Sequence, residues 1–251
     1  MATLSDLTSY LAGYLSLQAV NDYPQAYNGL QLENSGKVTR IAAAVDACEA
    51  VLNAAAAFGA DFLLVHHGLY WGGVPLVGGM YRKVHCAVKH DMAVYSAHLP
   101  LDVHPEVGNN VLLARALGIT NLEPFLRIKG QAAGMAGQWE WGGRAALVER
   151  LEGVLGGRVH VCAGGPERVS RVGVVTGGAG SEVARAAAEG VDTFITGEGP
   201  HWSYTLAEEL GVNLLYGGHY ATETFGVKAL AEHLSLRFEL PWALIDHPTG
   251  L

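Results

Sequence analysis

Residues 38–71 read VTRIAAAVDACEAVLNAAAAFGADFLLVHHGLYW. Two short apolar runs, 41–45 and 62–65, flank a window of helical spacing at 48–58, and such uninterrupted apolar runs are typical of buried strands. Further strands are predicted at 92–96, 172–176, 193–196 and 212–216. Further helices are predicted at 81–90, 109–117, 181–189, 202–210 and 222–234. This alternation predicts an α/β fold whose sheets are covered on at least one face.

A second segment resembles the first. Residues 169–202, VSRVGVVTGGAGSEVARAAAEGVDTFITGEGPHW, align with residues 38–71 without a gap, and nine positions are identical. Three identities are alanines in an alanine-rich stretch, whereas others are more specific: Gly59/Gly190, Asp61/Asp192, Gly68/Gly199 and Trp71/Trp202. We interpret the match as an internal duplication that gives two similar α/β halves, 1–126 and 127–251, joined near 126–137. Coincidence in a sequence of biased composition is the alternative.

The composition limits the classes of protein to consider. Of 251 residues, 50% are hydrophobic and only 16% charged, which excludes intrinsic disorder. The net charge of −8 argues against a protein that binds nucleic acid without regard to sequence. The chain has eleven histidines, a high number beside its sixteen lysines and arginines. Histidine is the commonest metal ligand and the usual acid or base near neutral pH. The histidines are therefore the first candidates for functional residues.

The compartment can also be predicted. The three cysteines, Cys48, Cys86 and Cys162, lack metal-type spacing and are expected to be buried thiols in a reducing compartment. No basic segment of a signal peptide precedes Asp6, and the most apolar stretch, 41–58, is too polar for a membrane span. We therefore expect a cytoplasmic protein with no membrane partner.

Three groups of ligand-type residues follow predicted strands. His66 and His67 come directly after the strand at 62–65, and ligands gather at the carboxyl ends of strands in α/β sheets. His98 with Asp102, and His219 with Glu223, each form an i, i+4 pair just past a strand, and an offset of 121 residues aligns the two pairs. Taken singly, each group could be a helix cap or a surface ion pair. Together they predict a metal site.

The chemistry of these side chains limits the metal. Imidazoles and carboxylates without a thiolate suit Zn²⁺, Mn²⁺, Fe²⁺, Co²⁺ or Ni²⁺. Two such ions about 3.5–4 Å apart, bridged by a carboxylate and a water, would form a hydrolytic centre that supplies a nucleophile at neutral pH. The sequence does not name the metal.

Glu198 and His201 lie in the segment TGEGPH (196–201), which occupies the place in the second half that His66 and His67 hold in the first. We assign them either to proton transfer beside the metal or to a structural role. The glycine-rich segment 177–181 could offer backbone amides to an anion. A tight turn with Ser181 as the cap of the following helix is favoured, because the spacing of a phosphate-binding loop is absent.

The chain resembles the Nif-three-like proteins, often labelled GTP cyclohydrolase 1 type 2. The resemblance rests on segments in order along almost the whole chain: NGLQ (28–31), VHHGLYW (65–71), SAHLPLD (96–102), GNN (108–110), GGAG (177–180), TGE (196–198) and GHYATE (218–223). It implies two metal ions per chain, held by His66, His67, Asp102, His219 and Glu223, with Glu223 as the bridge. His98 then lies close by and is not counted among the ligands. The resemblance also implies two similar α/β domains with the metal site between them, and a homohexameric ring.

The function that follows is a metal-dependent hydrolase acting on a small nucleotide-like or heterocyclic substrate. His98, His201 and Glu198 are the catalytic candidates. A metal-binding protein without turnover, active in metal handling or repair, is the second hypothesis. A ring that threads nucleic acid is the third, and the net charge of −8 disfavours it.

Overall fold

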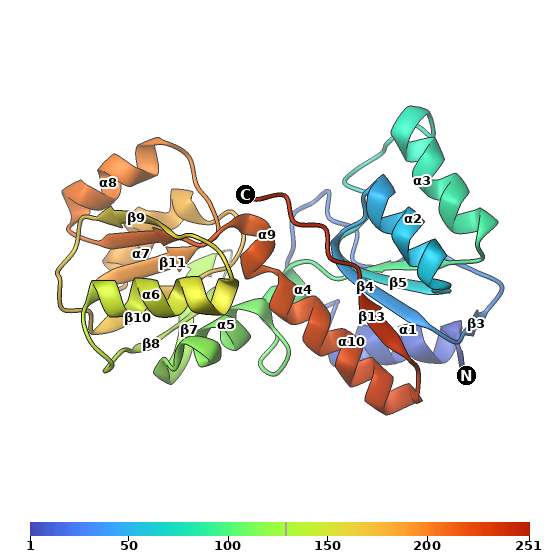
Figure 1. The fold of residues 1–251 in the computed structure, drawn as a ribbon, viewed down its shortest axis with the longest axis horizontal. Coiled ribbons are helices and arrows are strands. Elements are labelled where there is room, and N and C mark those ends of the chain that lie inside the picture. Colours follow the sequence, from blue (N-terminus) through green and yellow to red (C-terminus); the bar gives the residue numbers. More distant parts are fainter. Residues whose placement is uncertain (129) are drawn as a thin grey trace. The chain divides into compact units, whose positions relative to one another are not determined.

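The computed structural model describes residues 1–128 and 130–251. The chain forms two compact units, which we describe separately (Figure 1). The first comprises Met1–Leu101 and Gly226–His247, and the second comprises Asp102–Phe225 and Pro248–Leu251. The chain leaves the first unit at helix α4 (Leu99–Asp102) and returns to it through helix α10 (Thr224–Phe238).

The first unit is built on a mainly parallel sheet. Its elements are β1 (Ala2–Thr3), α1 (Leu4–Tyr14), β2 (Gly29–Leu32), β3 (Lys37–Val38), β4 (Ile41–Asp46), α2 (Glu49–Phe58), β5 (Phe62–His67), α3 (Gly78–Lys89), β6 (Ala93–Ser96) and β13 (Trp242–Leu244). In the described part of the chain the sheet has five strands in the order β13-β4-β5-β6-β2, and only β2 runs antiparallel to its neighbour. A separate two-stranded ribbon pairs β1 with β3.

Burial explains why these segments become strands. Residues 41–45 of β4 are all buried, so both faces of this strand are covered. On one face, α2 and α3 pack over β4, β5 and β6 (Figure 1), with Leu52 and Ala87 among the buried helix residues. Helix α2 ends at Phe58 and is capped by Gly59, whose φ of 75° suits glycine. The chain turns there toward β5.

The second unit holds a mixed sheet between helices. Its elements are α5 (Asn109–Leu117), β7 (Thr120–Ile128), β8 (Gln131–Gln138), α6 (Arg144–Leu155), β9 (His160–Ala163), β10 (Arg171–Val174), a 3₁₀ turn (Gly180–Glu182), α7 (Val183–Ala188), β11 (Thr193–Thr196), α8 (Trp202–Leu210), β12 (Asn213–Tyr216) and α9 (His219–Thr222). The order in the described chain is β7-β8-β10-β11-β12-β9, with the parallel strands β10, β11 and β12 at the centre.

Alternate residues of these central strands face different helices. Ile195 packs in a cluster with residues of α5 and α6, whereas Phe194 packs with residues of α7 and α8. The sheet of the second unit is therefore buried on both faces (Figure 1). All six predicted strands are present, with ends within two residues of the predicted ones. The predicted helix 181–189 begins as a 3₁₀ turn, and the predicted helix 222–234 begins at Thr224 and continues to Phe238.

The division into units differs from the predicted halves at 126/127. Of the predicted junction 126–137, residues 126–128 lie in β7 and residues 131–137 in β8 of the second sheet, and residue 129 lies outside the described residues. The segment 226–247 returns to the first unit, because β13 adds to the edge of the first sheet beside β4. The pairing of β8 with β10, and of β13 with β4, decided these points, and the sequence pattern contains no signal for either pairing.

Each unit contains the same local arrangement around an aspartate. The Asp61 carboxylate accepts hydrogen bonds from the backbone N–H groups of residues 39 and 40, at 2.8–3.0 Å. The Asp192 carboxylate accepts them from the N–H groups of residues 170 and 171, at 2.8 and 2.9 Å. These residues are the ones that the sequence alignment pairs.

Within residues 1–128 and 130–251, no helix is both long and apolar enough to cross a membrane.

Candidate functional site

His66 and His67 are the last residues of β5, in the middle of the first sheet. The neighbouring parallel strand β4 ends at Asp46, which lies opposite His67 in the register. His66 is fully buried and His67 is partly exposed. The strand thus delivers two imidazoles to the carboxyl edge of the sheet, where the sequence predicts ligands.

Hydrogen bonds define which nitrogen each of these imidazoles presents. Nδ1 of His66 donates to the carbonyl oxygen of Ala97 at 2.8 Å, because a carbonyl can only accept. Nδ1 of His67 lies 2.8 Å from Oδ1 of Asp46. An imidazole that donates from Nδ1 in this way leaves the lone pair of Nε2 as the atom that it could offer to a metal.

His98 follows β6 and is held in the same way by a residue far away in the sequence. Its Nδ1 lies 2.9 and 3.1 Å from the two carboxylate oxygens of Asp22, and its backbone N–H donates to Oδ1 of Asn28. Burial by itself would raise the pKa of Asp22, but hydrogen bonds from His98, Asn28 and the Tyr23 amide outweigh it and lower that pKa. Asp22 is thus a carboxylate that orients His98.

The three imidazoles form a group that could hold a metal ion. One ligand atom from each of His66, His67 and His98 lies within 4.8 Å of the others. Each ring is fixed by an acceptor at Nδ1, which is the arrangement found around metal-bound histidines. These residues therefore fit a divalent transition metal, and His98 joins the group as a third imidazole.

An aromatic rim borders this imidazole group. The indole of Trp71 meets the His98 ring edge to face, with centroids 4.9 Å apart, and Tyr23 lies 5.9 Å from the same ring. Trp71 is 40% exposed, so it lies at the surface rather than in the core. Apolar rings beside ligands keep water from surrounding them on that side.

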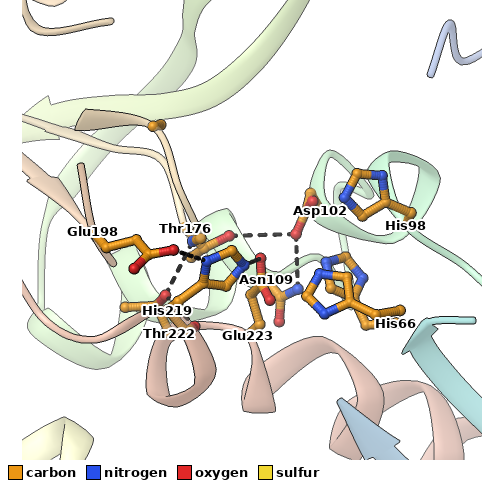
Figure 2. Close-up of polar contacts among 12 residues, drawn as sticks. His66, His98, Asp102, Asn109, Thr176, Glu198, His219, Thr222 and Glu223 are labelled. Carbon is orange, nitrogen blue, oxygen red and sulfur yellow. Dashed lines mark hydrogen bonds and ion pairs between the residues drawn. The ribbon is translucent and has the colours of Figure 1, made fainter. Parts of the chain in front are cut away.

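The second unit gathers the predicted carboxylates. Asp102 is buried, and its Oδ1 accepts from Nδ2 of Asn109 at 2.8 Å and from the Thr176 hydroxyl at 3.3 Å (Figure 2). The Asn110 side chain donates to the Asp102 carbonyl and accepts from the Thr176 N–H, both at 2.9 Å. These contacts join the start of the second unit to the segment after β10 and fix the carboxylate.

His219 lies between two carboxylates at the start of α9. Its Nδ1 is 2.8 Å from Oε1 of Glu198 and its Nε2 is 3.2 Å from Oε1 of Glu223 (Figure 2). The hydrogen bond to Glu223 raises the pKa of His219 to about 9, against the effect of burial, and Glu198 acts in the same direction as Glu223. With this raised pKa the His219 ring is an imidazolium near neutral pH, and its two N–H groups donate to Glu198 and Glu223.

Glycines allow this close arrangement. Gly177 has a φ of 71°, and a Cβ there would lie only 2.2 Å from Oε1 of Glu223. At Gly197 a Cβ would lie 2.7 Å from Cα of His219. Only glycine leaves room for Glu223 and His219 at these two positions.

Of the catalytic candidates, Glu198 contacts His219, whereas His201 is exposed at the start of α8. Both line one cavity of the second unit. No contact tests the proton-transfer roles of His98, His201 and Glu198, and these stay predictions.

Sequence reasoning did not assign roles to Asp22, Asp46, Asn109 or Thr176. Asp46 could have been found, because it follows the predicted strand 41–45 just as His66 follows its own strand. Asp22 could not, because it lies 76 residues from His98 and follows no predicted element.

The Asp46 contact gives a testable prediction. In Asp46→Asn, the side-chain amide can no longer hold the His67 ring as a carboxylate does, and we expect metal affinity to fall by about 10–100-fold. Titration of Zn²⁺ by calorimetry measures the loss. Glu49→Gln is the matched control, because it removes a carboxylate that pairs with Arg82 on the surface of the same unit. Equal affinities in the two variants would contradict an orienting role for Asp46.

Comparison with known proteins identifies the family. The family model of Duf34/NIF3 (NGG1p interacting factor 3) matches residues 2–249. The chain belongs to the DUF34/NIF3 family.

Similar members of the DUF34/NIF3 family cover nearly the same length. The GTP cyclohydrolase 1 type 2 homolog of Deinococcus radiodurans is 43% identical over 248 residues, 98% of this chain and 94% of the relative. The homolog of Pyrococcus abyssi is 42% identical over 249 residues, 98% of each chain. A crystal structure from Thermus thermophilus superimposes with a TM-score of 0.92 at 40% identity, over 100% of both chains. This DUF34/NIF3 protein thus has the mixed α/β fold of its relatives.

Proposed function

We propose that this protein binds two divalent transition-metal ions per chain and uses them as a hydrolase on a nucleotide or another heterocyclic substrate. The observation that carries the proposal is the group of three imidazoles, His66, His67 and His98, which offer ring nitrogens within 4.8 Å of one another. His66 and His67 would hold an ion, and His98 would stand beside it. The relatives named GTP cyclohydrolase 1 type 2 homolog favour this class of substrate.

The proposed ligands are the five residues that the family resemblance implies. We propose that His66 and His67 act together with Asp102, His219 and Glu223 in one dinuclear centre, with Glu223 as the bridging ligand. Such ions lower the pKa of a bound water to about 7. His98, Glu198 and His201 would then accept and return protons, and Asp22 and Asp46 would keep the imidazoles in the orientation that presents Nε2.

An internal duplication would account for the paired ligands. The equivalent contacts of Asp61 and Asp192 support this origin, as does the alignment of His98 with His219. A second proposal concerns assembly: the protein forms a homohexamer in the cytoplasm. Sedimentation velocity tests the assembly, and a monomer at micromolar concentration would contradict it.

Two measurements on the purified full chain test the function. Elemental analysis is expected to find close to two transition-metal ions per chain, and their absence after purification without chelator would overturn the metal site. The metal-loaded protein is then incubated with GTP and a panel of other heterocycles. Hydrolysis that is lost in His66→Ala supports the hydrolase, because this substitution removes a buried imidazole of the group.

Metal-loaded protein that turns over no heterocycle in the panel would contradict the hydrolase. That result would favour the second hypothesis, a protein that binds or hands over metal without catalysis.

A further inference from the structure

A cavity in the second unit borders the residues just described. Its volume is about 550 Å³, within the range of small-molecule sites. Side chains that line it include Arg158, His160, Glu198, His201, Tyr204 and Tyr216. We propose that this cavity binds the organic part of the substrate, a planar heteroaromatic ring that carries an anionic group. The inference rests on the proposed function in taking the bound molecule as the substrate.

Three aromatic rings form one wall of the cavity. His160 and Tyr216 are partners across β9 and β12, so they lie on the same face of the sheet. Their ring centroids are 6.1 Å apart with an angle of 25°, and Tyr204 of α8 lies 5.7 Å from His160. The Tyr216 hydroxyl forms a hydrogen bond with the Ser203 hydroxyl, which fixes this ring. A flat ring can stack on such a wall.

Charged groups border the same wall. Arg158 is exposed, and within the described residues no carboxylate pairs with it. An arginine of this kind can bind a phosphate or carboxylate through two parallel hydrogen bonds. Glu198 brings the opposite charge. Its carboxylate can accept a hydrogen bond from an N–H group of a heterocycle.

Glu198 also links the cavity to the metal ligands. Its Oε1 is 2.8 Å from His219, and its side chain is 49% exposed. The residue after Glu198, Gly199, packs closely against the aromatic wall. A Cβ there would lie only 3.1 Å from both the Ser203 hydroxyl and the Tyr216 ring. A ring held on the aromatic wall would therefore lie beside a carboxylate that touches His219. The cavity would select the substrate without itself holding a metal.

Binding to the full chain tests this inference, both with metal and after chelation, so that neither metal nor turnover is needed for the readout. The probes are guanosine monophosphate, guanosine, which lacks the anion, and ribose phosphate, which lacks the ring. We expect guanosine monophosphate to bind most tightly. Arg158→Gln should weaken its binding about tenfold or more, while leaving guanosine unchanged.

Two further variants test the ring and the charge. Tyr204→Leu keeps apolar bulk but removes the ring, and should weaken both guanosine and guanosine monophosphate roughly fivefold or more. Arg168→Gln removes the same charge from an exposed arginine outside the cavity and should bind like the unchanged protein. Circular dichroism establishes that each variant is folded.

Several results would overturn the inference: equal binding by Arg158→Gln and Arg168→Gln, equal affinity for guanosine and guanosine monophosphate, or no binding of any probe at millimolar concentration. These outcomes are separable from failure of the proposed function. Ligand binding by a protein that never holds metal would remove the hydrolase and leave the cavity assignment standing. Metal binding and turnover that Arg158→Gln leaves unchanged would remove the cavity assignment and leave the hydrolase standing.

Discussion

Replacement of Glu223 by glutamine is expected to remove both metal ions. The carboxylate is buried, and as the proposed bridging ligand it would be shared by both ions. An amide of nearly the same shape fills the same space but brings no charge and is a poor bridge, so the loss should come without a cavity in the core. Elemental analysis should fall from close to two ions per chain to nearly none, and hydrolysis should disappear with them.

The exposed Glu209→Gln is the control for loss of one negative charge from the same unit. Thermal unfolding of the metal-free proteins separates a local effect from a loss of fold. If Glu223→Gln kept one ion per chain, the imidazole group of the first unit would be an independent site and the bridging role would be wrong. If it kept both ions and full activity, Glu223 would not be a ligand.

Replacement of Gly177 by alanine is expected to have the second largest effect. Its φ of 71° is unfavourable for alanine by about 1–2 kcal/mol. In addition, the new methyl carbon would lie 2.2 Å from Oε1 of Glu223, so the carboxylate or the turn must move. We expect metal content and hydrolysis to fall nearly as far as in Glu223→Gln, although residue 177 offers no ligand atom.

Gly190→Ala separates the two effects. Gly190 has a φ of 81°, and a Cβ there would meet nothing within 4 Å. In urea titrations Gly190→Ala should lose only the free energy of unfolding that its φ costs, Gly177→Ala should lose more, and only Gly177→Ala should lose metal. Normal metal content in Gly177→Ala would show that the position of the Glu223 carboxylate is not critical.

The amino-acid sequence determined the central strands and the residues that follow them. Apolar runs and helical spacing are local properties, so β4, β5, β6, β10, β11 and β12 could be predicted to within two residues. The rule that ligands gather at the carboxyl ends of strands then selected His66, His67 and His98, which the structure brings together. It likewise selected His219 and Glu223, which contact each other.

Only the tertiary structure decided which distant residues support these ligands. Asp22 meets His98 across 76 positions, and β13 joins the first sheet although it lies almost at the other end of the chain. The free energy of such contacts comes from burial and hydrogen bonding between segments that have no common pattern. A periodic sequence therefore determines where strands and ligands occur, whereas the partners that orient them depend on how the whole chain packs.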